Sequence, residues 1–180
     1  MKSDSIKKVV LGSAALAAAG PLAMPARAAT DAVPIEAIIL APVQITQTQS
    51  LNFGSLTEAG AGGTATVDNT GAITPGAGIT SIGGTIQAGG FTLKATAALK
   101  VTVTAPTKVS ITETVGGVAK MVVDKFTAEG KAGTLNATPL VHTMVAATDT
   151  GLDLGGRLTI GAAQLAGTYQ GSVVLTANYQ

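Results

Sequence analysis

The sequence predicts an all-β protein built as an antiparallel sandwich of two sheets, and three observations lead to this prediction. Val, Ile and Thr are abundant between frequent glycines, a composition that favours strands over helices. No stretch after residue 28 keeps a helical period of apolar residues. Several short apolar runs are separated by Gly-rich turns, which is the spacing typical of a sandwich.

The first expected strand is Val43–Thr46. Pro42 separates it from the residues before it, because proline has no N–H to donate to a sheet. Gly116-Gly117 indicates a two-residue hairpin, and other turns are expected at Asp68–Gly71, Pro75-Gly76 and Gly130–Gly133. Further strands are expected, in chain order, at Gly63–Asp68, Gly78–Ile82, Phe91–Thr96, Lys100–Thr104, Lys108–Val115, Val118–Thr127 and Arg157–Gly161.

The last expected strand occupies Gly167–Gln180, where apolar and polar residues alternate. Only Val174 interrupts the polar face. We therefore expect one half-buried strand with Tyr179 packed beside the core. The apolar face contains Tyr169, Gly171, Val173, Leu175, Ala177 and Tyr179.

Residues 1–28 have the pattern of a secretory signal peptide. Lysines near Met1 precede an apolar run, and Ala26-Arg27-Ala28 places small residues where signal peptidase cuts. We expect a signal helix, cleavage after Ala28, and no stable membrane span afterwards, since the apolar run is short and is broken by Gly20-Pro21. The exported chain then carries seven basic and nine acidic residues, a net charge of about −2, which does not favour nucleic-acid binding.

Residues 29–41 are expected to form an extended strand ahead of a domain at 42–180. Every odd position from Val33 to Ile45 is apolar, and the candidate interaction residues are Val33, Ile35, Ala37 and Ile39. An apolar strand outside the first domain strand either forms an edge of its own sheet or pairs with another chain.

No catalytic, metal or cofactor site is expected. Asp149-Thr-Gly151 spells the aspartic-protease motif once, where two carboxylates are needed, so we interpret it as a turn. His142 is the only histidine and cysteine is absent, which removes the usual zinc and hydrolase sites. Gly130-Lys131 lacks the rest of a phosphate loop, and Asn136-Ala-Thr138 is too common a match to carry a role.

Four motifs in order resemble an uncharacterised family of small secreted bacterial β-sandwich proteins. They are Pro42–Ile45, Leu51-Asn-Phe-Gly54, Gly155–Gly161 and Gly167–Tyr179. The closing segment is in turn similar to the C-terminal strand of chaperone–usher pilus subunits, which has a glycine fourteen residues from the end and a penultimate tyrosine. Gly167 and Tyr179 match those positions, although this chain lacks the disulfide usual in pilins.

The resemblance implies an immunoglobulin-like sandwich in an exported fimbrial subunit that polymerises by donor-strand complementation. Its partners would be copies of itself or related subunits, with a periplasmic chaperone and an outer-membrane usher during export to the cell surface. Gly167, Tyr169, Val173, Leu175 and Tyr179 would form the terminal strand of the interaction site. The alternative is a self-complemented periplasmic or surface monomer that binds an unknown ligand, such as a carbohydrate or a protein. The lack of Trp disfavours carbohydrate binding.

Overall fold

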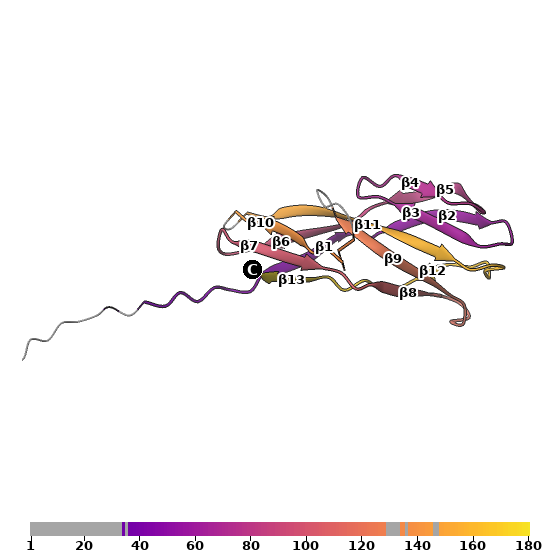
Figure 1. Cartoon of the computed structure of the whole chain (residues 1–180). Coiled ribbons are helices and arrows are strands. Elements are labelled where there is room, and N and C mark those ends of the chain that lie inside the picture. The colour runs from indigo at the N-terminus through magenta and orange to yellow at the C-terminus, as the bar shows by residue number, and fades with distance from the viewer. Residues whose placement is uncertain (1–33, 35, 129–133, 136, 146–147) are drawn as a thin grey trace, which may run out of the picture. The chain divides into compact units, whose positions relative to one another are not determined.

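The computed structural model is an all-β structure, drawn in Figure 1, and it describes residues 34, 36–128, 134–135, 137–145 and 148–180. Those residues contain thirteen strands and no helix. The expected signal helix at residues 1–28 lies outside the described part. The strands are β1 Gln44–Gln49, β2 Asn52–Glu58, β3 Gly63–Val67, β4 Ile73–Pro75, β5 Ile79–Gln87, β6 Gly89–Lys94, β7 Lys100–Thr104, β8 Lys108–Glu113, β9 Lys120–Ala128, β10 Leu140–Thr143, β11 Thr150–Ile160, β12 Tyr169–Gln170 and β13 Thr176–Tyr179.

All strand pairs of the described chain are antiparallel, and they form three hydrogen-bonded sheets where the sequence predicted two. The largest sheet has the order β1-β6-β11-β9-β8-β12, and β3 and β4 extend it from β11. The second sheet has the order β10-β7-β13, and β2 pairs with β5 in the third. This arrangement agrees with the predicted β-sandwich.

One apolar core joins the largest sheet to the three-stranded sheet. Phe91 and Leu158 contribute to it from the large sheet, and Val101, Val103 and Leu140 contribute from the small one. Their alternation along each strand places every second side chain inside. Phe126 reaches the core because a bulge shifts the pairing of β9 with β11. Lys125, at the bulge, has a φ of 48°, which agrees with the strong local twist of such a bulge.

An ion pair on the other face of β9 fixes that register. Arg157 in β11 lies opposite Asp124 in β9, and its Nε and Nη2 donate to the two carboxylate oxygens at 2.9 and 2.8 Å. The carboxylate raises the pKa of Arg157 through this side-chain hydrogen bond. A paired fork of this kind favours one alignment of the strands over a slipped one.

The two ends of the domain at residues 38–180 can be defined from the strand pairing. At the entry end, β1 begins, β6 ends, and the backbone N–H of Gln180 donates to Lys100. At the tip end, the turn between β8 and β9 lies beside the loop that leads into β12, since the N–H of Thr114 donates to the carbonyl of Thr168 at 2.8 Å. Figure 1 shows β7, β10 and β13 at the entry end and β12 toward the tip end.

Candidate functional site

The C-terminal segment, defined as residues 167–179, runs antiparallel to Lys100–Glu113. Tyr169 pairs with Glu113 in β8, and Tyr179 pairs with Val101 in β7. The prediction of one continuous strand is wrong, because residues 171–175 form no strand and the two short strands belong to different sheets. The segment therefore starts in the large sheet and ends in the small one.

Pro106 accounts for the interruption. It lies in the link between β7 and β8, opposite the unpaired stretch 171–175, and it has no N–H to donate to a neighbouring strand. The pairing register also differs by two residues between the two halves, as the partners of Tyr169 and Tyr179 show. The sequence signal was present in Pro106, but it lies outside the segment whose alternation predicted the strand.

The alternation nevertheless predicted the correct side-chain pattern. Val173, Leu175, Ala177 and Tyr179 are partly buried and pack against the core, whereas Ser172, Val174, Thr176 and Asn178 are exposed. Gly171, by contrast, is exposed, and a Cβ there would lie 2.7 Å from the Ile111 side chain. The segment is thus a half-buried edge despite its irregular centre.

One edge of β13 carries no strand in the described chain. The N–H of Gln180 donates to Lys100 at 2.9 Å, so alternation in an antiparallel ladder directs the backbone groups of Asn178 toward β7 as well. The N–H and C=O groups of Ala177 and Tyr179 then point away from β7, where no partner strand is described. Unpaired groups of this kind can pair with an added strand.

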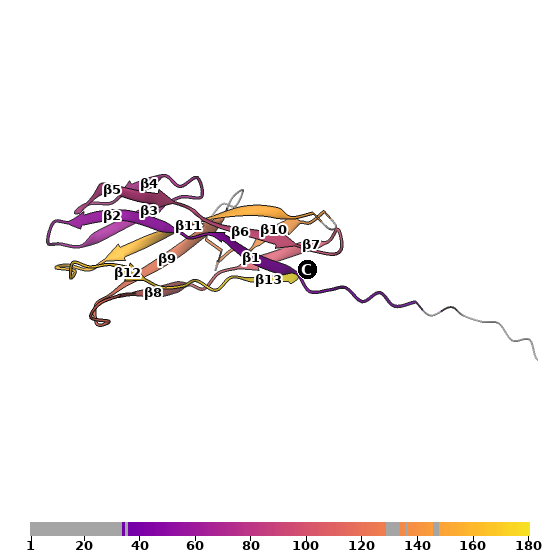
Figure 2. The ribbon, with the colours of Figure 1, turned by 180° about the vertical axis from the view of Figure 1, so that it is seen from behind.

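The first strand, β1, lies beside this free edge. It pairs only with β6 among the described strands, and it lies beside β13 in both Figure 1 and Figure 2. We call the line along which these two strands lie beside each other the seam. The seam joins two sheets whose nearest strands are not hydrogen-bonded to each other in the described chain.

Gly167 packs against a buried carboxylate. A Cβ at this position would lie 2.8 Å from Cγ of Glu113, closer than real Cβ atoms come. The Glu113 side chain accepts hydrogen bonds from the N–H groups of Val115, at 2.9 Å, and Gly116. The bond from Gly116 first, and then that from Val115, lowers the pKa of Glu113 below its ordinary value of 4.5. Sequence reasoning did not single out Glu113, although it stands three residues before Gly116-Gly117.

Tyr169 fixes the beginning of the C-terminal segment. Its hydroxyl donates to the carbonyl of Leu165 at 2.6 Å and accepts from Nε2 of Gln164 at 2.8 Å. A tyrosine that bonds back to the backbone a few residues upstream is typical of a corner in immunoglobulin-like sandwiches. The hydroxyl of Tyr179, in contrast, is buried and has no hydrogen-bond partner in the described chain.

Two of the four N-terminal candidate interaction residues lie in the described part of the chain. Val33 and Ile35 lie outside the described residues, whereas Ala37 and Ile39 are described and exposed. Ile38 is 87% exposed and Ile39 is 95% exposed, and residues 36–43 belong to no strand. Both faces of this apolar run are therefore open to solvent.

The other motifs carry no site in the described residues. His142 lies in β10 opposite Val101, as a strand residue. The interpretation of Asp149-Thr-Gly151 as a turn is wrong, because Thr150 and Gly151 open β11 and Asp149 pairs with Lys94 at 3.4 Å. Residues 130–133 and Asn136 lie outside the described part. No group of three metal-ligating side chains occurs among the residues described.

None of the described residues form a helix that is long and apolar enough to span a bilayer. The family model described as "Domain of unknown function (DUF4402)" matches residues 43–179, which include every strand from β1 to β13. No curated protein matches the chain.

Proposed function

We propose that this chain, which belongs to the DUF4402 family, is an exported structural subunit of a surface filament. Its domain is an immunoglobulin-like sandwich that lacks one strand at the seam. A neighbouring copy supplies that strand from residues 29–41, so that subunits join by strand addition. The protein has no catalytic role in this proposal.

The free edge of β13 beside β1 is the observation that carries the proposal. Outward N–H and C=O groups at Ala177 and Tyr179 are positioned to pair with an added strand, which is how extended peptides dock on sheet edges. The same chain contains an apolar segment that pairs with no strand in the described residues. An acceptor and a donor on one chain are sufficient for a homopolymer.

The apolar face of the donor supplies the driving force. Burying a Val or Ile side chain contributes roughly 1.5–3 kcal/mol. Val33, Ile35 and Ile39 together then offer on the order of 5–9 kcal/mol before ordering costs, comparable to the stability of a small domain. Ala37, the third of the four odd positions, adds a small side chain.

The experiment compares two adjacent substitutions in the intact exported protein. Ile38→Asp and Ile39→Asp change exposed residues on opposite faces of an extended strand. We expect Ile39→Asp to abolish the ladder of oligomers in unboiled SDS samples, since it places a carboxylate where the neighbouring copy would bury an apolar side chain. Ile38→Asp should retain the ladder. Sedimentation velocity checks in solution that Ile38→Asp forms oligomers and that Ile39→Asp does not.

The alternative function makes a different forecast. If the intact protein sediments as a monomer at every concentration, and peptide Ala29–Ala41 stabilises only a variant that lacks its own copy of that segment, the strand completes its own sandwich. That result would contradict the filament proposal and support the self-complemented monomer.

A further inference from the structure

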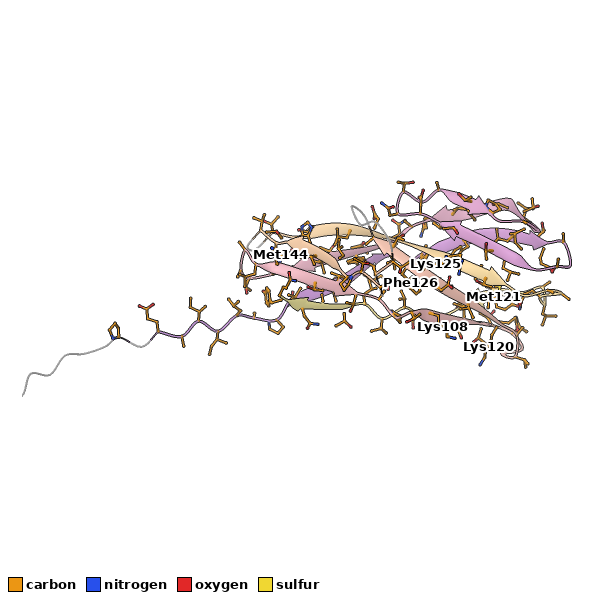
Figure 3. All side chains as sticks on the ribbon, viewed as in Figure 1. Lys108, Lys120, Met121, Lys125, Phe126 and Met144 are labelled. Carbon is orange, nitrogen blue, oxygen red and sulfur yellow. The ribbon has the colours of Figure 1, made fainter. Side chains whose placement is uncertain are left out.

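An exposed apolar cluster lies at the tip end of the domain. Val115 and Val118, in the turn between β8 and β9, are 93% and 84% exposed, and Leu165 in the neighbouring loop is 60% exposed. Val115, Leu165 and Ala166, together with Glu113, line an open hollow of about 440 Å³. Figure 3 marks this end by Lys120, at the start of β9. Exposed apolar side chains that cluster in this way indicate an interaction surface.

The entry end carries a second, different apolar surface. Leu99 and Val145 are exposed there, next to the backbone bond from Met144 to Leu99, and Leu40 precedes β1 at the same end. Met144 marks this end in Figure 3. Two unlike surfaces at opposite ends of one domain can join head to tail in a heterologous contact.

The lengths of the two segments fix how a donor fits. Ala29–Ala41 and Gly167–Tyr179 each contain thirteen residues, which span about 43 Å when fully extended at 3.3 Å per residue. A donor antiparallel to β13 therefore ends with Leu40 beside Gly167, at the tip hollow. A parallel donor would bring its own domain to the acceptor's entry end, where residues 38–43 already lead into β1, and would leave both tip clusters bare.

We infer that the tip hollow is the docking site for the entry end of a second copy of this chain. The inference rests on the proposed function and adds to it the direction and the contact. The donor runs antiparallel to β13, and its Leu40 packs against Val115 and Leu165 of the acceptor. The donor's Leu99 and Val145 face the acceptor's turn between β8 and β9.

The absence of cysteine from the sequence allows a clean cross-linking test. A differently tagged Leu40→Cys protein is mixed with Leu165→Cys or, as the entry-end control, with Asn178→Cys, and the mixtures are mildly oxidised. We expect a disulfide between positions 40 and 165 of different copies and none between 40 and 178. Linkage of 40 to 178, or assembly without linkage to 165, would overturn the inference and leave the proposed function standing. A mixture that does not assemble at all would contradict both.

A second measurement does not depend on engineered cysteines. Val115→Ser with Leu165→Ser should weaken assembly at least about tenfold, because the tip contact loses its apolar side chains. Ile82→Ser is the control, since Ile82 is also apolar and exposed but lies in β5, outside the tip and outside the C-terminal segment. Equal assembly of the two variants in sedimentation experiments, with unchanged melting temperatures, would also overturn the inference.

Discussion

The N-terminal segment at residues 36–43 and the C-terminal segment at 167–179 have the same kind of sequence and different structures. Both carry apolar residues at every odd position, from Ala37 to Val43 in the first and from Tyr169 to Tyr179 in the second, where Gly171 counts with the apolar face. Leu175 and Tyr179 are partly buried and pack against the core, whereas Ile38 and Ile39 are almost fully exposed. The difference is the partner: β7 and β8 pair with the C-terminal segment, and no described strand pairs with the N-terminal one.

The comparison shows that the spacing of apolar residues predicts which side of a strand is buried, but not which strand pairs with it. A strand gains its stability from main-chain hydrogen bonds and from burial of one face, and both require a second surface. The free edge of β13 offers such a surface, and the unpaired N-terminal segment lacks one. The predictions below test the packing of the C-terminal segment and the pairing of the N-terminal one.

The largest expected effect comes from Tyr179, in the packed segment. Tyr179→Asp should destabilise the domain by about 3 kcal/mol or more, because a charge enters an apolar site without a partner. Tyr179→Phe is the control and should be neutral or slightly stabilising, since the hydroxyl is buried and unbonded in the described chain. Urea unfolding measures both variants, each combined with Ile39→Asp so that the expected loss of assembly leaves folding stability as the quantity compared. Equal midpoints for the two variants would show that Tyr179 is not packed as described.

The next effect concerns how the packed segment begins. Gly167→Ala should cost about 1–3 kcal/mol, because the new Cβ overlaps Glu113, whose carboxylate is held by the turn. Gly151→Ala is the control, since a Cβ there meets nothing within 4 Å. Thermal unfolding should separate the two variants, and identical melting temperatures would contradict the close contact.

A smaller effect depends on pH. Because the folded state lowers the pKa of Glu113, the carboxylate stabilises the fold above pH 4.5, and this contribution is lost as the pH falls below that value. Glu113→Gln removes the titrating group, while Glu58 and Asp68, whose pKa values are also lowered, remain in both proteins. The stability difference between parent and variant should therefore shrink between pH 5 and pH 3. A difference independent of pH would contradict the bonding of Glu113.

Much of the fold was predictable because local patterns carry it. Lys100–Thr104 is β7 with the expected bounds, and Gly63–Asp68 differs from β3 by one residue. β4, which ends at the expected turn residue Pro75, was missed because three residues give no periodicity. β5 continues to Gln87, beyond the expected end of that strand at Ile82, and passes through Gly83 and Gly84, which both have positive φ values.

The candidate site was predictable in its side chains and not in its backbone. The apolar face of the C-terminal segment follows from the sequence, but the free edge depends on which strand lies beside it. The strand neighbours depend on Pro106 and on pairing between distant segments, which a local sequence pattern does not predict. The contact of Glu113 with Gly167 likewise could not be predicted, because the fold brings together two residues that are far apart in the sequence.

Amide hydrogen exchange on β13 tests the central claim most directly. The acceptor is full-length protein with Ile35→Asp and Ile39→Asp, to which a peptide of the native Ala29–Ala41 sequence is added. The account predicts that the outward N–H groups of Ala177 and Tyr179 become protected on addition, whereas Asn178, directed toward β7, is protected throughout. Unchanged exchange at Ala177 and Tyr179 under saturating peptide would contradict strand addition at the seam.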